Sequence, residues 1–168
     1  MPYAQRFQHA DDVVAHLNTV VPNLADPLLK AKYTGFVTIA AVTVYEMAIK
    51  DIFYEFAKKK HAVFGRYIES KFKRINGKIG LEVIKDDYVK CFGVTYLRRF
   101  KTALDNASDG YLRQNRRDFR SAYTNLIVWR NDFAHEGSVK AQTTYAEVVQ
   151  AYEDGKQVIH TLASSMVR

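Results

Sequence analysis

Apolar side chains recur at the spacing of an amphipathic helix along nearly the whole chain, and this periodicity limits the fold more than any other feature. Glycines and prolines, eight and three in 168 residues, are few, and most stand at plausible breaks. The alternation of Val, Ile and Thr that is typical of strands is nearly absent. We therefore expect an all-α protein, with residues 1–168 forming a single-domain helical bundle of six to seven helices.

The stretch from Pro27 to about Lys60 is predicted to be the central helix of this bundle. Asp26 and Pro27 form a good N-cap and first-turn pair, and residues 36–56 are apolar on more than one side. A helix that is apolar on several sides is usually surrounded by other elements, so this one should lie in the core.

Shorter helices are expected before and after the central one. The predicted ranges are Asp11 to Val21, ended by Pro22; Ala62 to Ile75; Leu81 to Phe92, ended by Gly93; and a helix from Thr95 that ends in a turn from Asn106 to Gly110. The last helix should begin at Thr144, which has capping-box spacing to Glu147. Gly155, on the apolar side of that helix, permits close approach of a neighbour.

The segment from Trp129 to Gly137 holds the one grouping of residues that we expect to do chemistry. Arg130 and Asn131 are followed by His135 at the end of a strong helical pattern, and Gly137 then stops the helix. At about 100° per residue, Arg130 falls near the apolar stripe, whereas Asn131 and His135 share a different flank. A guanidinium on the packed side needs a carboxylate, a set of carbonyls or an incoming phosphate as its partner.

Glu46 stands among apolar residues of the central helix and has two interpretations. It forms an i,i+4 ion pair with Lys50 on a solvated edge, or it holds the guanidinium of Arg130 across the bundle. The sequence leaves both open.

The residues Arg130, Asn131, Ala134, His135 and Gly137 resemble the R-x4-6-H signature of HEPN domains, which are small helical bundles, many of them metal-independent ribonucleases. In that family the motif lies late in the domain, at the end of a long helix that one more helix follows, and the predicted helices here have that order. The resemblance implies a HEPN-like bundle with Arg130, Asn131 and His135 as catalytic residues. It also implies an RNA substrate, a homodimer, and a toxin or host-defence role with a cognate antitoxin or regulatory protein.

The sequence departs from the family pattern at two positions near the histidine. Glu136 stands where many relatives continue directly from His to Gly. Gly137 stands where one toxin subgroup has a tyrosine that is modified, so that mode of control is not implied.

Four arginines, Arg113, Arg116, Arg117 and Arg120, form the densest basic patch in the chain and are predicted to open the helix that carries the motif. They either line a groove that follows an RNA backbone or cover an ordinary solvated helix face. The net charge of +7 and the pI near 9.4 support a polyanionic partner.

Other classes of site have no candidate in the sequence. The remaining histidines lie at no ligand spacing, and adjacent carboxylates such as Asp86 and Asp87 diverge on a helix, so neither a metal nor another cofactor is expected. Cys91, the one cysteine, is predicted to lie in the core and agrees with a reducing cytoplasm. No apolar stretch of membrane-spanning length and no signal at Met1 occurs, so we expect a soluble, cytoplasmic protein without membrane contact.

Two functions fit these observations. In the first, the protein is a metal-independent endoribonuclease in which the 2′-hydroxyl of the RNA attacks the phosphate. His135 then transfers a proton, Arg130 neutralises charge on the phosphorane, and Asn131 orients the histidine or donates to a phosphate oxygen. In the second, the same helices form a non-catalytic RNA- or protein-binding module, in which Arg130 is a buried structural ion and His135 caps a helix.

Overall fold

The computed structural model describes residues 2–75, 77–139 and 143–167, and within these ranges the chain is helical and has no strand. The six α-helices are α1 (Phe7–Val20), α2 (Pro27–Lys60), α3 (Ala62–Phe72), α4 (Val94–Asn115), α5 (Phe119–Glu136) and α6 (Tyr145–Ser165). The 3-10 helices η1 (Pro2–Arg6), η2 (Val21–Asn23) and η4 (Val89–Phe92) and the π-helix η3 (Val83–Tyr88) connect them. The prediction of an all-α bundle is confirmed.

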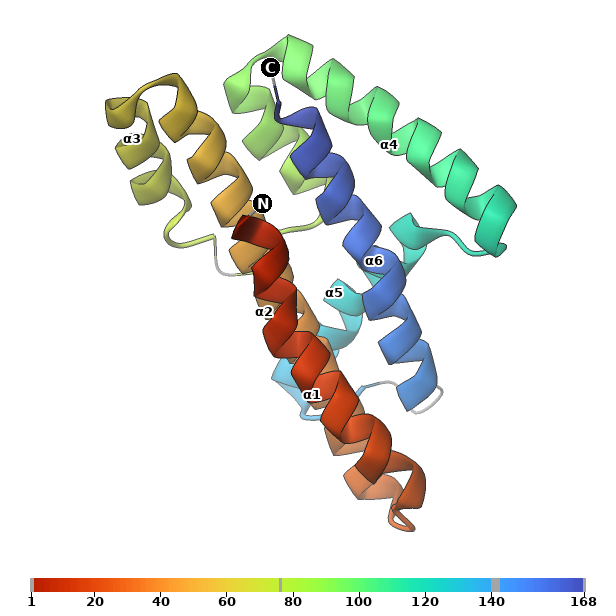
Figure 1. The fold of residues 1–168 in the computed structure, drawn as a ribbon. Coiled ribbons are helices and arrows are strands. Elements are labelled where there is room, and N and C mark those ends of the chain that lie inside the picture. The colour runs from red at the N-terminus through yellow and green to blue at the C-terminus, as the bar shows by residue number, and fades with distance from the viewer. Residues whose placement is uncertain (1, 76, 140–142, 168) are drawn as a thin grey trace.

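Helix α2 is the central element, as predicted. The side chain of Asp26 accepts a hydrogen bond from the amide of Leu28 at 2.8 Å, and Pro27 occupies the first turn. At 1.5 Å per residue the 34 residues of α2 extend for about 51 Å. Helices α1 and α6 lie along it in Figure 1, and α5 also packs against it. The buried side chains of these helices belong to one core cluster.

Three tyrosines at the centre of the core join α2, α5 and α6. The ring of Tyr45 stacks on Tyr123 at 5.4 Å and on Tyr152 at 5.8 Å between centroids, and its hydroxyl donates to the carbonyl of Tyr152. A Cβ atom at Gly155 would lie 2.7 Å from that hydroxyl. The close approach predicted at Gly155 is therefore confirmed, and the neighbour is Tyr45.

The capping box of the last helix is also confirmed. The amide of Glu147 donates to the hydroxyl of Thr144, and the carboxylate of Glu147 accepts from the amide of Thr144 at 2.7 Å.

Helix α4 contradicts the turn predicted from Asn106 to Gly110, because it continues through these residues to Asn115. The residue types there are typical of turns, but Ala107 and Tyr111, one turn apart, pack against the core. The hydroxyl of Tyr111 donates to Asp154 of α6 at 2.7 Å. These contacts keep the segment helical despite its low propensity.

Cys91 is exposed, so the prediction that it lies in the core is wrong. Residues 81–92 are helical, but η3 and η4 replace the regular α-helix that was expected. The change of pitch turns Ile84 and Val89 inward and leaves Cys91 outside, where its thiol donates to the carbonyl of Asp87 at 2.9 Å. No helix in the described ranges is long and apolar enough to cross a membrane.

Candidate functional site

The motif residues lie in the last two turns of α5, whose ends are both capped. Asp118 accepts a hydrogen bond from the amide of Arg120 at 2.9 Å at the start of the helix. At its end Gly137 has a φ of 68°, and its amide donates to the carbonyl of Phe133. The ammonium of Lys32, from α2, donates to the carbonyl of Gly137 at 2.6 Å. The predicted glycine stop is present, and α2 fixes it in place.

Phe133 packs the end of α5 against α2. A Cβ atom at Gly35 would lie 2.0 Å from the phenyl ring of Phe133, so the ring occupies the space that any larger residue at that position would need. This contact determines how closely the motif helix approaches α2.

Arg130 is half-buried and points toward the chain between α3 and η3. A Cβ atom at Gly77 would lie 1.6 Å from Nη2 of Arg130, so the guanidinium rests directly on the backbone of Gly77. Its Nη1 atom donates to Oδ1 of Asn131 at 2.9 Å. The direction predicted for Arg130, toward the packed side of α5, agrees with this placement.

Glu46 pairs with Lys50, at 2.6 Å between Oε1 and Nζ, and not with Arg130. Its other oxygen, Oε2, accepts a hydrogen bond from the amide of Gly77 at 2.5 Å. Lys50 also donates to the carbonyl of Lys73 at 3.2 Å. Glu46 and Lys50 therefore fix the segment on which the guanidinium of Arg130 lies, and Glu46 reaches Arg130 only through Gly77.

His135 and Asn131 are exposed on the solvent side of α5. The side chain of His135 forms no hydrogen bond in the described part of the chain, and Asn131 turns its carbonyl oxygen to Arg130 rather than to the histidine. Arg130 and His135 therefore face different sides of the same helix end.

The four arginines of the predicted basic patch are divided between elements. Arg113 lies in α4, contrary to the prediction that it opens the motif helix, because α4 extends to Asn115. Arg117 bonds Asp154 through Nε at 2.8 Å and Nη2 at 3.2 Å, and Arg120 bonds Asp105 at 2.6 Å. The hydrogen bond to Asp154 raises the pKa of Arg117. Arg113 and Arg116 are exposed and form no ion pair within the described ranges.

The patch lies at the opposite end of α5 from the motif. Arg120 and His135 are 15 residues apart, about 22 Å along the helix axis. The segment around Gly77, on which Arg130 lies, carries the exposed cations Lys73, Arg74 and Lys78. No pattern in the sequence of this segment indicates that it meets α5.

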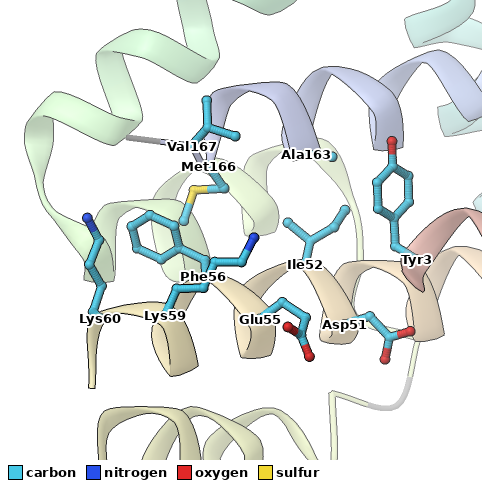
Figure 2. A pocket seen from close by; sticks show the side chains of 10 residues that line it. All are labelled: Tyr3, Asp51, Ile52, Glu55, Phe56, Lys59, Lys60, Ala163, Met166 and Val167. Carbon is cyan, nitrogen blue, oxygen red and sulfur yellow. The ribbon is translucent and has the colours of Figure 1, made fainter. Parts of the chain in front are cut away.

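A cavity of about 460 Å³ lies elsewhere, between η1, the C-terminal part of α2 and the end of α6 (Figure 2). Its apolar wall includes Ile52, Phe56 and Met166, and Lys59 and Glu55 stand at its edge. It shares no residue with the motif. Within the residues that the structure describes, no cluster of three or more histidine, cysteine, aspartate or glutamate side chains has the arrangement of a metal site.

Comparison with known proteins gave one result, a match to a protein family. The match is to the family described as RiboL-PSP-HEPN and covers residues 3–168. No curated protein and no solved structure matches the chain. The matched range includes every helix from α1 to α6 and the segment from Trp129 to Gly137. The chain therefore belongs to the RiboL-PSP-HEPN family, as the resemblance of its motif to HEPN domains implied.

Proposed function

We propose that the protein is a metal-independent endoribonuclease that acts through the end of α5. The 2′-oxygen of the RNA attacks the adjacent phosphorus, and the bond from phosphorus to the 5′-oxygen breaks. The 2′-hydroxyl loses its proton to a base, and the leaving 5′-oxygen gains one. The products carry a 2′,3′-cyclic phosphate and a 5′-hydroxyl, so no protein nucleophile takes part.

Arg130 is the group that stabilises charge on the phosphorane. The observation that carries the proposal is its guanidinium, which contacts Gly77 and Asn131 and has no carboxylate partner among the described residues. A planar, permanent cation held in this way can bind a phosphate through two parallel hydrogen bonds. Asn131 holds the guanidinium through its Oδ1 atom, which leaves its amide nitrogen to donate to a phosphate oxygen.

His135 is the proton-transfer group, since an imidazole changes protonation near neutral pH and this one is exposed in the last turn of α5. Because Arg130 faces Gly77 and His135 faces solvent, a homodimer with a two-fold axis near the ends of α5 would complete one cleft from two copies. The reaction would take place in the cytoplasm. A toxin or defence role with a cognate antitoxin rests on the family resemblance alone.

The test compares cleavage of a mixed RNA pool by the wild type with cleavage by His135→Ala and Arg130→Ala. Both variants should lose orders of magnitude in rate, and EDTA should change nothing. DNA should be inert because it lacks the attacking hydroxyl. His9→Ala, which removes an exposed histidine of α1, is the matched control and should cleave like the wild type.

The unfolding free energy of Arg130→Ala distinguishes a catalytic role of Arg130 from a structural one. Among the described residues its side chain forms one hydrogen bond, to the exposed amide of Asn131, so Arg130→Ala should cost at most about 1 kcal/mol of unfolding free energy. Cleavage that EDTA abolishes, or that persists in both variants, would overturn the proposal. The non-catalytic binding module would then be the better account.

A further inference from the structure

A second cavity of about 460 Å³ is a groove between the N-terminal parts of α5 and α6, and it has no role in the function proposed above. Its lining includes Arg117, Ser121, Asn125 and Trp129 from the side of α5 and Gln150 and Asp154 from α6. The small side chains of Ala122 and Ala151 complete it, which leaves the groove open between the two helices.

Trp129 and Asn125 line the groove from the same side of α5. Trp129 is the single tryptophan of the chain and is half-buried. Neither its indole N–H nor the side-chain amide of Asn125, one turn earlier, has a hydrogen-bond partner within residues 2–75, 77–139 and 143–167. A planar ligand that stacks on the indole would therefore meet an unused donor and an unused acceptor at its edge.

The acidic groups of the groove already have partners. Asp154, which is 2 % exposed, accepts hydrogen bonds from Tyr111, Arg117 and Gln150. Asp118 and Glu147 cap α5 and α6. Three carboxylates disfavour a phosphate inside the groove, but they do not oppose a neutral ring. The exposed cations Arg113 and Arg116 lie just before Arg117, which lines the end of the groove.

We propose that this groove binds a base of single-stranded RNA. The base stacks on Trp129 and its edge bonds the amide of Asn125, while the flanking phosphates remain outside the groove and the strand continues toward Arg117 and the exposed Arg113 and Arg116. The basic patch would then bind RNA at the N-terminal end of α5, which is the end far from His135. That the bound RNA is the substrate rests on the function proposed above.

Helix geometry connects the groove to the candidate catalytic end. Trp129 and His135 are six residues apart, about 9 Å along the axis of α5. The two residues also lie about 120° apart around the helix, so a strand with one base on Trp129 must follow the surface around α5 to reach His135.

The single tryptophan makes the groove directly observable. In the His135→Ala protein, which cannot cut the probe, we expect an RNA oligonucleotide to quench tryptophan fluorescence in a saturable way, because a stacked base contacts the indole. Asn125→Ala in that background should weaken binding by about tenfold. Gln8→Ala, which removes an exposed amide on α1, should bind like the parent.

A labelled oligonucleotide measures the contribution of Trp129 itself by fluorescence anisotropy. Trp129→Ala should weaken binding by about tenfold to a hundredfold, and Trp129→Phe, which keeps a stacking face, should restore most of the affinity. Since Trp129 also packs against the core, a failure of Trp129→Ala to fold would leave Asn125→Ala as the deciding variant.

The outcomes separate this inference from the catalytic one. Quenching that is absent, or that neither Asn125→Ala nor Trp129→Ala changes, would overturn the base-binding groove even if the wild type cuts RNA. Saturable quenching together with a wild type that does not cleave RNA would support the groove and refute the catalytic proposal.

Discussion

Replacing Gly77 by alanine should disable Arg130 without unfolding the protein. The new Cβ atom would lie 1.6 Å from Nη2, 2.7 Å from Cζ and 3.0 Å from Nη1 of Arg130. The backbone at Gly77 cannot retreat easily, because Glu46 bonds its amide and Lys50 bonds the carbonyl of Lys73. The guanidinium, at the end of a flexible side chain, must therefore move by about 2 Å to reach an ordinary contact distance.

The cost in stability comes from the backbone. Gly77 has a φ of 73°, and an alanine in this left-handed region costs about 1–2 kcal/mol. For a chain of this size, that corresponds to a fall of roughly 2–8 °C in Tm. The cost in activity is larger, because a displacement of even 1 Å in a catalytic group can lower the rate by about a hundredfold.

Thermal unfolding and RNA cleavage measured on the same preparations separate these effects. Gly77→Asn tolerates the left-handed backbone better but still carries a Cβ atom, so it should regain stability and remain impaired in cleavage. Gly80→Ala is the control within the same segment, since its Cβ atom would meet nothing within 4 Å, and it should cleave normally. If Gly77→Asn cleaves RNA at the wild-type rate, the contact between Arg130 and Gly77 does not matter for the chemistry.

Three further perturbations test other parts of the fold. Asp154→Ala removes the acceptor of hydrogen bonds from Tyr111 and from two further side chains. In a denaturant titration it should lower the unfolding free energy by about 2–3 kcal/mol. A loss below about 0.5 kcal/mol, roughly that of a neutral surface substitution, would contradict this. Gly35→Ala places a Cβ atom 2.0 Å from the ring of Phe133 and should cost about 1–3 kcal/mol by overpacking, whereas an unchanged Tm would show that the ring yields freely. Burial and, to a smaller extent, the charge of Lys156 lower the pKa of His160 in the folded protein, so the unfolded chain binds the proton more readily. The unfolding free energy should therefore fall as the pH drops below about 6.5. A His160→Gln variant with the same pH profile as the wild type would count against this assignment.

The features that the sequence predicted correctly depend on residues close together in the chain. The caps at Asp26 and Thr144 and the stop at Gly137 involve hydrogen bonds over two to four residues, so a short pattern identifies them. The pair of Glu46 with Lys50 is equally local, and it is the one of the two open alternatives that the structure contains. The side of α5 that Arg130 faces followed from helical periodicity.

The features that the sequence did not predict depend on contacts between distant segments. Gly77 and Arg130 meet across 53 residues, and no pattern in either segment indicates the other. The acids that pair with Arg117 and Arg120 come from α6 and α4, so a dense basic run in the sequence became two ion pairs and two exposed cations. Tyr111 keeps α4 helical through residues whose local preference is a turn, because its partner, Asp154, is on another helix.

The glycines that meet α5 also determine its axial register. Phe133 occupies the space at Gly35 on one neighbouring segment, and Arg130 rests on Gly77 of another, less than one turn apart along α5. Sliding α5 by one turn, about 5.4 Å, would remove Phe133 from the space at Gly35 and Arg130 from Gly77. The two contacts would be lost together, so the end of the motif helix has one position along its axis and does not ratchet between two.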